Sequence, residues 1–466
     1  MRRQGSNNTF GYRRPNHPIF GVEWDRGSDP SLTRINNAKG MTANVGVDST
    51  TVTNDFDNAD IFREIEDVED SLGNKFVRIP KFYMKKGVDT EYRSWQISKT
   101  RYNGFYLPKI FWDFDKSREL PYFDFGKHKA TKDGDNKLQS IADKPPLVNK
   151  NIVDFRTYAE NNNTGGLAGY QQLDIHAIDV LRTLMFIEFG TLNIQSIMKG
   201  YTEGQYEASH TAVTATTDTN TIIASNSTGS NYKVGQTISV GSSRGNNSVF
   251  YGRTITAIDA DTPSAGETTI TFDGDAVSIA VDDVLYNTGW INGFSSDISA
   301  TSGSIGDNTS GKYPCMYRGI ESPFGDVWQF VDGVNINDNQ AWICENADNY
   351  ASNLFAEPYE QLGYVNHNSN GYVSQMGYDS NYPFIELSTE VSGSSSTYYS
   401  DYYYQYGGQR IALFGAYWND GSNAGVSYWN LNNSSGNANV NIARQTLIRK
   451  KYCIICTSSP SPLGEN

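Results

Sequence analysis

The 466-residue sequence predicts an α+β protein in which strands dominate and one long helix packs against them. Segments between His17 and Phe114 alternate apolar and polar residues, as half-buried strands do. Apolar residues recur at three- and four-residue spacing in Leu173–Asn193, which is typical of a helix. Residues 208–287 are rich in Thr, Ser, Val and Ile and contain many turn signals. They predict a small all-β barrel or sandwich inserted into the main domain.

Charge and hydropathy exclude several function classes. The net charge of -14 argues against sequence-independent nucleic-acid binding, which depends on Lys and Arg at phosphates. No apolar run approaches the ~20 residues that span a bilayer. The basic start of the chain is not followed by the apolar core of a signal peptide. We therefore expect no nucleic-acid partner, no membrane insertion and no export by the general secretory route.

The chain begins with a basic arm, residues 1–16, which contains Arg2, Arg3, Arg13 and Arg14. Two interpretations stay open for it. One is a mobile, soluble tail, and the other is an arm that docks onto an acidic partner subunit.

Strand signals follow the arm. We expect strands in His17–Gly27, in Gly73–Gly87 and in Ser94–Phe114, with Pro80 and Pro108 at edges or strand ends. The polar residues 127–163 predict a long surface loop.

The predicted helix has recognisable ends. Asp174 is expected to cap its start and Gly190 its end. Its apolar face contains Ile175, Ile178, Leu181, Met185 and Phe189. His176 on this helix is interpreted as a structural hydrogen-bonding residue, because no nucleophile motif lies nearby.

The inserted module, residues 208–287, has flanks that resemble the main domain in composition. Insertion into a surface loop is tolerable because the entropy of loop closure rises slowly with length. A structural spacer and a second recognition module are both open, and the spacer is the preferred interpretation.

Residues 410–447 are the most informative segment, because Asn, Ser, Gly, Tyr and Trp crowd into it. Apolar residues recur through it and predict a fixed scaffold: Ile411, Leu413, Phe414, Trp418, Val426, Trp429, Leu431, Val440, Ile442 and Leu447. The polar residues between them predict a ligand-binding surface: Tyr417, Asn419, Asp420, Ser422, Asn423, Ser427, Tyr428, Asn430, Asn432, Asn433, Asn437, Asn439 and Asn441. Recognition surfaces of this composition combine aromatic contact area with adaptable hydrogen bonds.

This pattern resembles the variable region of phage tropism determinants, whose C-terminal domain has the C-type-lectin fold. In that family a diversity-generating retroelement rewrites adenines, and Asn codons are favoured targets. The stretch RGIESPFGDVWQFVDGVNI, Arg318–Ile336, is similar to the formylglycine-generating-enzyme branch of the same fold. The resemblance implies a C-type-lectin-like domain in two parts, 94–207 and 288–457, with a variable region at 410–447. It also implies a β-rich attachment region at 17–93, and a flexible tail is expected at 458–466.

Candidate chemistry is sparse. Cys315, Cys344, Cys453 and Cys456 are interpreted as buried structural thiols, because CxxC in a strand points its two thiols to opposite faces. The five histidines are scattered, so no iron or copper ligand set is expected. No spacing singles out a carboxylate pair for glycoside hydrolysis. WND at Trp418–Asp420 matches a motif of calcium-dependent lectins, but we interpret the match as coincidental.

The sequence therefore predicts a bacteriophage receptor-binding protein on the virion surface, in a tail fibre, tail tip or head fibre, made in the host cytoplasm. Expected partners are a host cell-surface protein or glycan, and other virion proteins through the N-terminal region. The resemblance implies a homotrimer, in which several weak sites on one particle give avidity. We expect no catalytic residues, metal or cofactor. The alternatives are a structural decoration protein and, less favoured, a formylglycine-generating-type enzyme or a glycan depolymerase.

Overall fold

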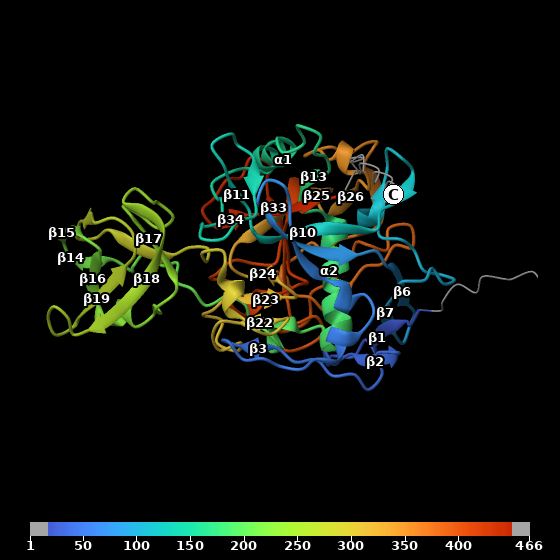
Figure 1. Ribbon diagram of the computed structural model, residues 1–466, viewed down its shortest axis with the longest axis horizontal. Helices are drawn as coiled ribbons and strands as arrows, with labels where there is room; N and C mark the ends of the chain where they lie inside the picture. Colours follow the sequence, from blue (N-terminus) through green and yellow to red (C-terminus); the bar gives the residue numbers. More distant parts are fainter. Residues whose placement is uncertain (1–16, 450–466) are drawn as a thin grey trace, which may run out of the picture.

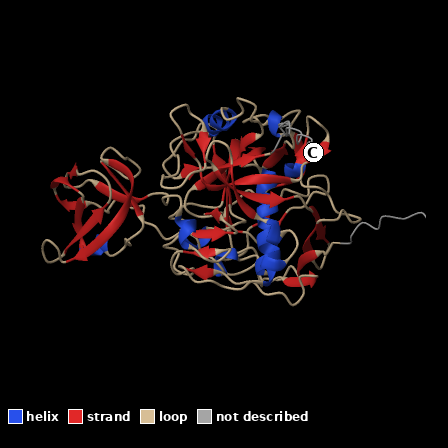
Figure 2. Cartoon of the chain, viewed as in Figure 1, coloured by secondary structure: helices blue, strands red, loops and turns tan. Residues whose placement is uncertain are grey.

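Strands dominate the computed structural model, which describes residues 17–449. Strands make up 36% of the chain and helices 12%, and the sheets are curled (Figure 2). The prediction of a strand-rich chain is confirmed. The α+β class is not confirmed, because the prediction rested on one long helix and the structure contains few other helices. The basic arm, residues 1–16, and the predicted tail, residues 458–466, lie outside the described residues.

The largest sheet has eight strands and contains the Asn-rich segment. Its order is β27 (Glu360–Val365), β26 (Gln340–Ile343), β25 (Trp328–Asn337), β32 (Gln409–Phe414), β33 (Trp429–Asn433), β31 (Tyr402–Gln405) and β28 (Gly371–Tyr372), with β34 (Ile442–Ala443) pairing with β25. Nine of the ten residues of β25 are buried, so other elements cover both of its faces.

Three further sheets complete the main body. The five-stranded sheet has the order β13 (Tyr170–Gln172), β35 (Gln445–Ile448), β10 (Tyr122–Lys129), β5 (Lys75–Pro80) and β4 (Glu66–Glu69). One four-stranded sheet has the order β2 (Thr33–Asn36), β1 (Phe20–Trp24), β7 (Arg93–Ser98) and β6 (Tyr83–Val88). The other has the order β24 (Ile320–Glu321), β23 (Cys315–Tyr317), β22 (Gly303–Ser304) and β3 (Gly46–Val47). Two-stranded pairs join β8 (Trp112–Asp113) to β9 (Arg118–Glu119), and β29 (Gln375–Met376) to β30 (Ser388–Glu390).

The predicted long helix is α2 (Ile175–Phe189), which runs through the centre of the body (Figure 1). Its predicted ends are confirmed: the Asp174 side chain accepts a hydrogen bond from the backbone N–H of Ala177, and Gly190 ends the helix in the left-handed region. The prediction of a single apolar face is wrong, because all 15 residues of α2 are buried. Its polar side chains therefore need partners inside the protein.

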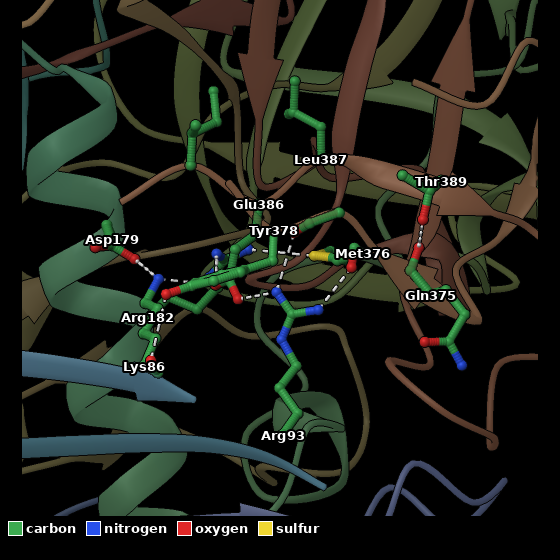
Figure 3. A network of polar contacts seen from close by, with 12 residues as sticks. Lys86, Arg93, Asp179, Arg182, Gln375, Met376, Tyr378, Glu386, Leu387 and Thr389 are labelled. Carbon is green, nitrogen blue, oxygen red and sulfur yellow. Dashed lines mark hydrogen bonds and ion pairs between the residues drawn. The ribbon is translucent and has the colours of Figure 1, made fainter. Parts of the chain in front are cut away.

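A buried ion network supplies partners for two of them (Figure 3). Lys86 of β6 lies between Asp179 of α2 and Glu386, with 2.9 Å from its Nζ to Glu386. Arg93 of β7 and Arg182 of α2 also form ion pairs with Glu386. Burial opposes ionisation of Glu386, but these three cations hold the pKa of its carboxyl well below the usual value. Burial raises the pKa of Asp179 to about 6.

The predicted division between an N-terminal region, 17–93, and a main domain that starts at residue 94 does not match the fold. β5 pairs with β10, and Lys86 and Arg93 bind α2 and the segment before β30. Side chains from Phe20 to Leu447 share one hydrophobic core. The local strand pattern of 17–93 carries no information about these long-range partners.

The polar segment 127–163 is also more ordered than predicted. It contains the end of β10, the hairpin of β11 (Thr131–Lys132) and β12 (Leu138–Gln139), and α1 (Ile152–Glu160). Asn151 and Asp154 form a capping box at the start of α1, so polar residues that look like a loop define a helix end.

The segment predicted as an inserted module forms a lobe beside the body (Figure 1). Its six-stranded sheet has the order β14 (Ala212–Thr214), β16 (Thr221–Ser225), β19 (Glu267–Phe272), β18 (Phe250–Ala260), β17 (Thr237–Gly241) and β21 (Val284–Asn287). β15 (Thr216–Thr219) pairs with β20 (Val277–Ile279), and α3 (Asn226–Gly229) is one turn long. The lobe has a hydrophobic core of its own. Its two ends meet: the backbone N–H of Gln205 donates to Asn287 Oδ1 at 2.7 Å, and the backbone N–H of Asn287 donates to the Gln205 carbonyl at 2.8 Å.

Candidate ligand-binding surface

The Asn-rich strand β33 lies between β32 and β31 in the largest sheet. Because side chains alternate along a strand, Trp429 and Leu431 point into the core and are fully buried, while Asn430 and Asn432 are half-buried. The Trp429 ring lies 5.2 Å from the ring of Phe414 on β32. The alternation of Trp, Asn, Leu and Asn thus builds the scaffold and the polar surface from one strand.

The loop from Gly415 to Tyr428 is anchored on the residues that lead into the lobe. Trp418 is fully buried, and its ring lies 5.7 Å from the ring of Tyr206. Asn419 Nδ2 donates to the Gly204 carbonyl at 2.8 Å. The backbone N–H of Gly421 donates to the Thr202 carbonyl at 2.9 Å. These contacts fix the backbone on which the polar side chains of the loop stand.

Asp420 is the acidic residue of this loop. Its Oδ2 accepts a hydrogen bond from the backbone N–H of Tyr417 at 3.0 Å. Burial raises the pKa of Asp420 to about 7, and the hydrogen bond from Tyr417 only partly opposes this effect. The charge of the surface therefore changes near neutral pH.

Four asparagines, three in β33 and one after it, form a network of amides. Asn430 Oδ1 accepts from the backbone N–H of Asn432 at 3.1 Å and from Asn433 Nδ2 at 3.2 Å. Asn433 Nδ2 also donates to Asn432 Oδ1 at 2.6 Å, and Asn437 Nδ2 donates to Asn433 Oδ1. The amides hold one another in place, so the donors and acceptors of this surface have fixed positions.

Eleven of the predicted site residues are partly or fully exposed, and we call them the display surface: Tyr417, Asn419, Asp420, Ser422, Asn423, Asn430, Asn432, Asn433, Asn437, Asn439 and Asn441. All ten predicted scaffold residues are buried. The structure therefore separates the two sets largely as the sequence predicted.

Ser427 and Tyr428 are corrections to that prediction, because both are buried. The backbone N–H of Ser427 donates to Asp401 Oδ2 at 2.7 Å. Tyr428 is 3% exposed, and its ring contacts Trp328 edge-on at 4.8 Å. The chain enters the core at Ala424 and Val426 and then turns. Ser427 and Tyr428 follow this turn, so neither side chain has an exposed face.

Several tyrosines outside the predicted set border the display surface. The Tyr372 hydroxyl lies 2.9 Å from Ser422 Oγ, and the Tyr372 ring contacts Tyr402 at 5.2 Å. Along β31, Tyr402 and Tyr404 are half-buried while Tyr403 is buried. Tyrosine side chains therefore face alternately outward and inward along this strand. Tyr206 carries no signal in the sequence, and only the fold brings it to Tyr417.

The described residues contain no group of three or more His, Cys, Asp or Glu side chains placed to hold a metal ion. Cys315 and Cys344 are buried free thiols, and burial raises the pKa of Cys315 to about 12. Burial lowers the pKa of His176 to about 3, and its ring packs on Phe384 at 4.2 Å. Cys453 and Cys456 lie outside the described residues.

A cavity of about 320 Å³ lies between α1 and β13. Asp332 in its wall is engaged by ion pairs with Arg156 and Arg444 and by a hydrogen bond from Gln172. These contacts occupy the carboxylate in a structural role.

No protein-family model matches the chain, and no curated protein matches it.

No helix in residues 17–449 is both long and apolar enough to cross a membrane.

Proposed function

We propose that this chain is a receptor-binding protein on the surface of a bacteriophage particle, and that the display surface contacts a protein or glycan of the host cell. One observation carries the proposal. Fully buried Trp418 and Trp429 alternate with exposed or half-buried polar side chains along one continuous segment. Such a surface binds by shape, aromatic contact and hydrogen bonds, and it tolerates substitution because the scaffold fixes the backbone.

The finer fold assignment is part of the same proposal. We infer a C-type-lectin-like body of the formylglycine-generating type, with GDVWQFVDG at the start of β25 as its sequence signature. The curled largest sheet and the central helix α2 support this inference. The proposal includes a homotrimer in which the N-terminal region attaches to other virion proteins. Static light scattering on the purified chain tests the trimer, and a monomer at micromolar concentration contradicts it.

The adhesin proposal is tested by binding to cells. The fluorescently labelled chain is incubated with a panel of bacterial strains, and binding is measured by flow cytometry. We expect binding to a subset of strains. It is lost in the triple variant Asn430→Ala, Asn432→Ala and Asn437→Ala, while the melting temperature stays within a few degrees.

The matched control replaces three asparagines elsewhere: Asn58→Ala, Asn349→Ala and Asn381→Ala, all at exposed positions. This control retains binding if the display surface is the contact site. Equal loss in both triple variants, or a display surface covered by neighbouring subunits in the particle, favours a structural decoration protein instead.

Diversification of the surface is tested in the neighbouring DNA. We expect a near-identical repeat of the segment for residues 410–447 that differs at adenines, beside a reverse-transcriptase reading frame. If the locus lacks the repeat and the reverse-transcriptase frame, the surface is not diversified and the proposal is reduced to an adhesin with a fixed surface.

A further inference from the structure

A cleft of about 350 Å³ lies where the lobe meets the body. One wall comes from the segment around β11 and β12, on the side of the body that faces the lobe (Figure 1). The other wall comes from Asn247 and Tyr251 at the start of β18. The Tyr251 hydroxyl lies 3.4 Å from the Pro146 carbonyl, so the two walls touch at the base of the cleft.

The charged side chains that line this cleft are Lys132 and Lys144, and the described lining contains no Asp or Glu. Lys132 Nζ donates to Asn136 Oδ1 at 2.8 Å and to the Asp133 carbonyl at 3.5 Å, which are both neutral acceptors. Within residues 17–449, the Lys144 ammonium has no hydrogen bond or ion pair. In a chain of net charge -14, two ammonium groups without a carboxylate partner make this cleft a local site for an anion.

The cleft is continuous with the display surface. Asn149 lines the cleft, and its backbone N–H donates to the Asn439 carbonyl at 3.0 Å. Val148, which precedes Asn149, and Val440, which follows Asn439, belong to the same hydrophobic cluster. The exposed residue Asn439 is therefore hydrogen-bonded through its backbone to a residue that lines the cleft, which places the display surface next to the cleft.

We propose that this cleft binds the anionic part of a saccharide, carrying a carboxylate or a phosphate, that extends from the display surface; this deepens the receptor-binding function and rests on it. The amides of Gln139, Asn149 and Asn247 both donate and accept, as recognition of sugar hydroxyls requires. Tyr251 and Pro145, which are both half-buried, offer apolar contact for a sugar face. A volume of about 350 Å³ is within the range of small-ligand sites.

The test is calorimetric titration of the full chain with four probes. They are trigalacturonate as the carboxylate probe, mannose 6-phosphate as the phosphate probe, a neutral galactose trisaccharide, and an Asp- and Glu-rich octapeptide. We expect at least one anionic saccharide to bind, with an affinity that falls as salt rises. The neutral sugar and the peptide are expected to bind at least tenfold more weakly.

The double variant Lys132→Ala and Lys144→Ala is expected to lower the affinity for the anionic saccharide by about tenfold or more. The matched control, Lys39→Ala and Lys233→Ala, removes the same charge from exposed positions and is expected to bind normally. The inference is overturned if neither anionic saccharide binds, if the peptide binds most tightly, or if both double variants lose affinity equally.

Cell binding separates this inference from the receptor-binding proposal. If the display-surface triple variant loses cell binding while the Lys132 and Lys144 variant keeps both cell and saccharide binding, the cleft inference fails alone. If the lysine variant loses the saccharide while neither variant affects binding to any strain, the cleft is a saccharide site and the adhesin proposal fails.

Discussion

Polar side chains concentrate in two regions of this molecule, and the regions are built differently. Around Glu386 the polar groups are charged, fully buried and paired with one another across three segments of the chain. On the display surface they are mostly amides and hydroxyls and at least partly exposed, and the asparagines between residues 430 and 437 bond to close neighbours in sequence. The first region fixes the fold and the second depends on it. Substitution is therefore expected to lower the free energy of unfolding strongly around Glu386 and only slightly on the display surface.

The largest expected effect comes from Glu386→Gln. It leaves Lys86, Arg93 and Arg182 buried with Asp179 as the remaining carboxylate of the network, so uncompensated charge stays in the interior. We expect a loss of about 3–5 kcal/mol in the free energy of unfolding, measured by urea denaturation. Glu91→Gln at an exposed position is the control and should change stability by less than about 0.5 kcal/mol. Similar values for the two variants would mean that the network does not hold the fold.

Trp429→Ala tests the scaffold side of the display segment. The fully buried ring packs on Phe414, so its removal leaves a cavity that the sheet cannot close. We expect a loss of about 3–5 kcal/mol, followed by circular dichroism in urea. A loss below about 1 kcal/mol would show that Trp429 is not part of a fixed framework.

Asp420→Asn probes the titratable group of the surface. The pKa of Asp420 is raised to about 7, above the unfolded value, so ionisation costs stability as pH rises from about 4 through 7. The variant should be more stable than the parent at pH 8, by about 1–2 kcal/mol after allowance for partial exposure, and equal to it near pH 4. The melting temperature at both pH values measures this difference. A constant difference across that pH range would contradict the shifted pKa.

Asn432→Ala gives the smallest expected effect. Its side-chain oxygen accepts from a neighbouring amide at a half-buried position, so we expect a change of less than about 1 kcal/mol in stability. The comparison of interest is with Trp429→Ala in the same denaturation experiment. Equal losses would remove the distinction between scaffold and display.

Patterns within a few residues of sequence predicted the features that depend on near neighbours, namely helix ends and the alternation of burial along a strand. The ends of α2 follow from Asp174 and Gly190, and the alternation of Trp429, Asn430 and Leu431 correctly separated buried from exposed side chains. Burial of the polar face of α2 was not predictable, because its partner Glu386 lies 204 residues away from Arg182. Ser427 and Tyr428 were misassigned because their composition matches that of display residues, whereas a tertiary turn decides their burial.

The paired ends of the lobe have a practical consequence. Two hydrogen bonds join Gln205 to Asn287 where the lobe leaves the body, so the residues between Tyr206 and Asn287 can be exchanged as one unit. A foreign domain whose termini lie equally close is expected to fold there if Tyr206 is kept after Gln205, because the Tyr206 ring contacts the ring of Trp418. This joint is therefore the position at which the lobe is best exchanged without disturbing the sheets of the body.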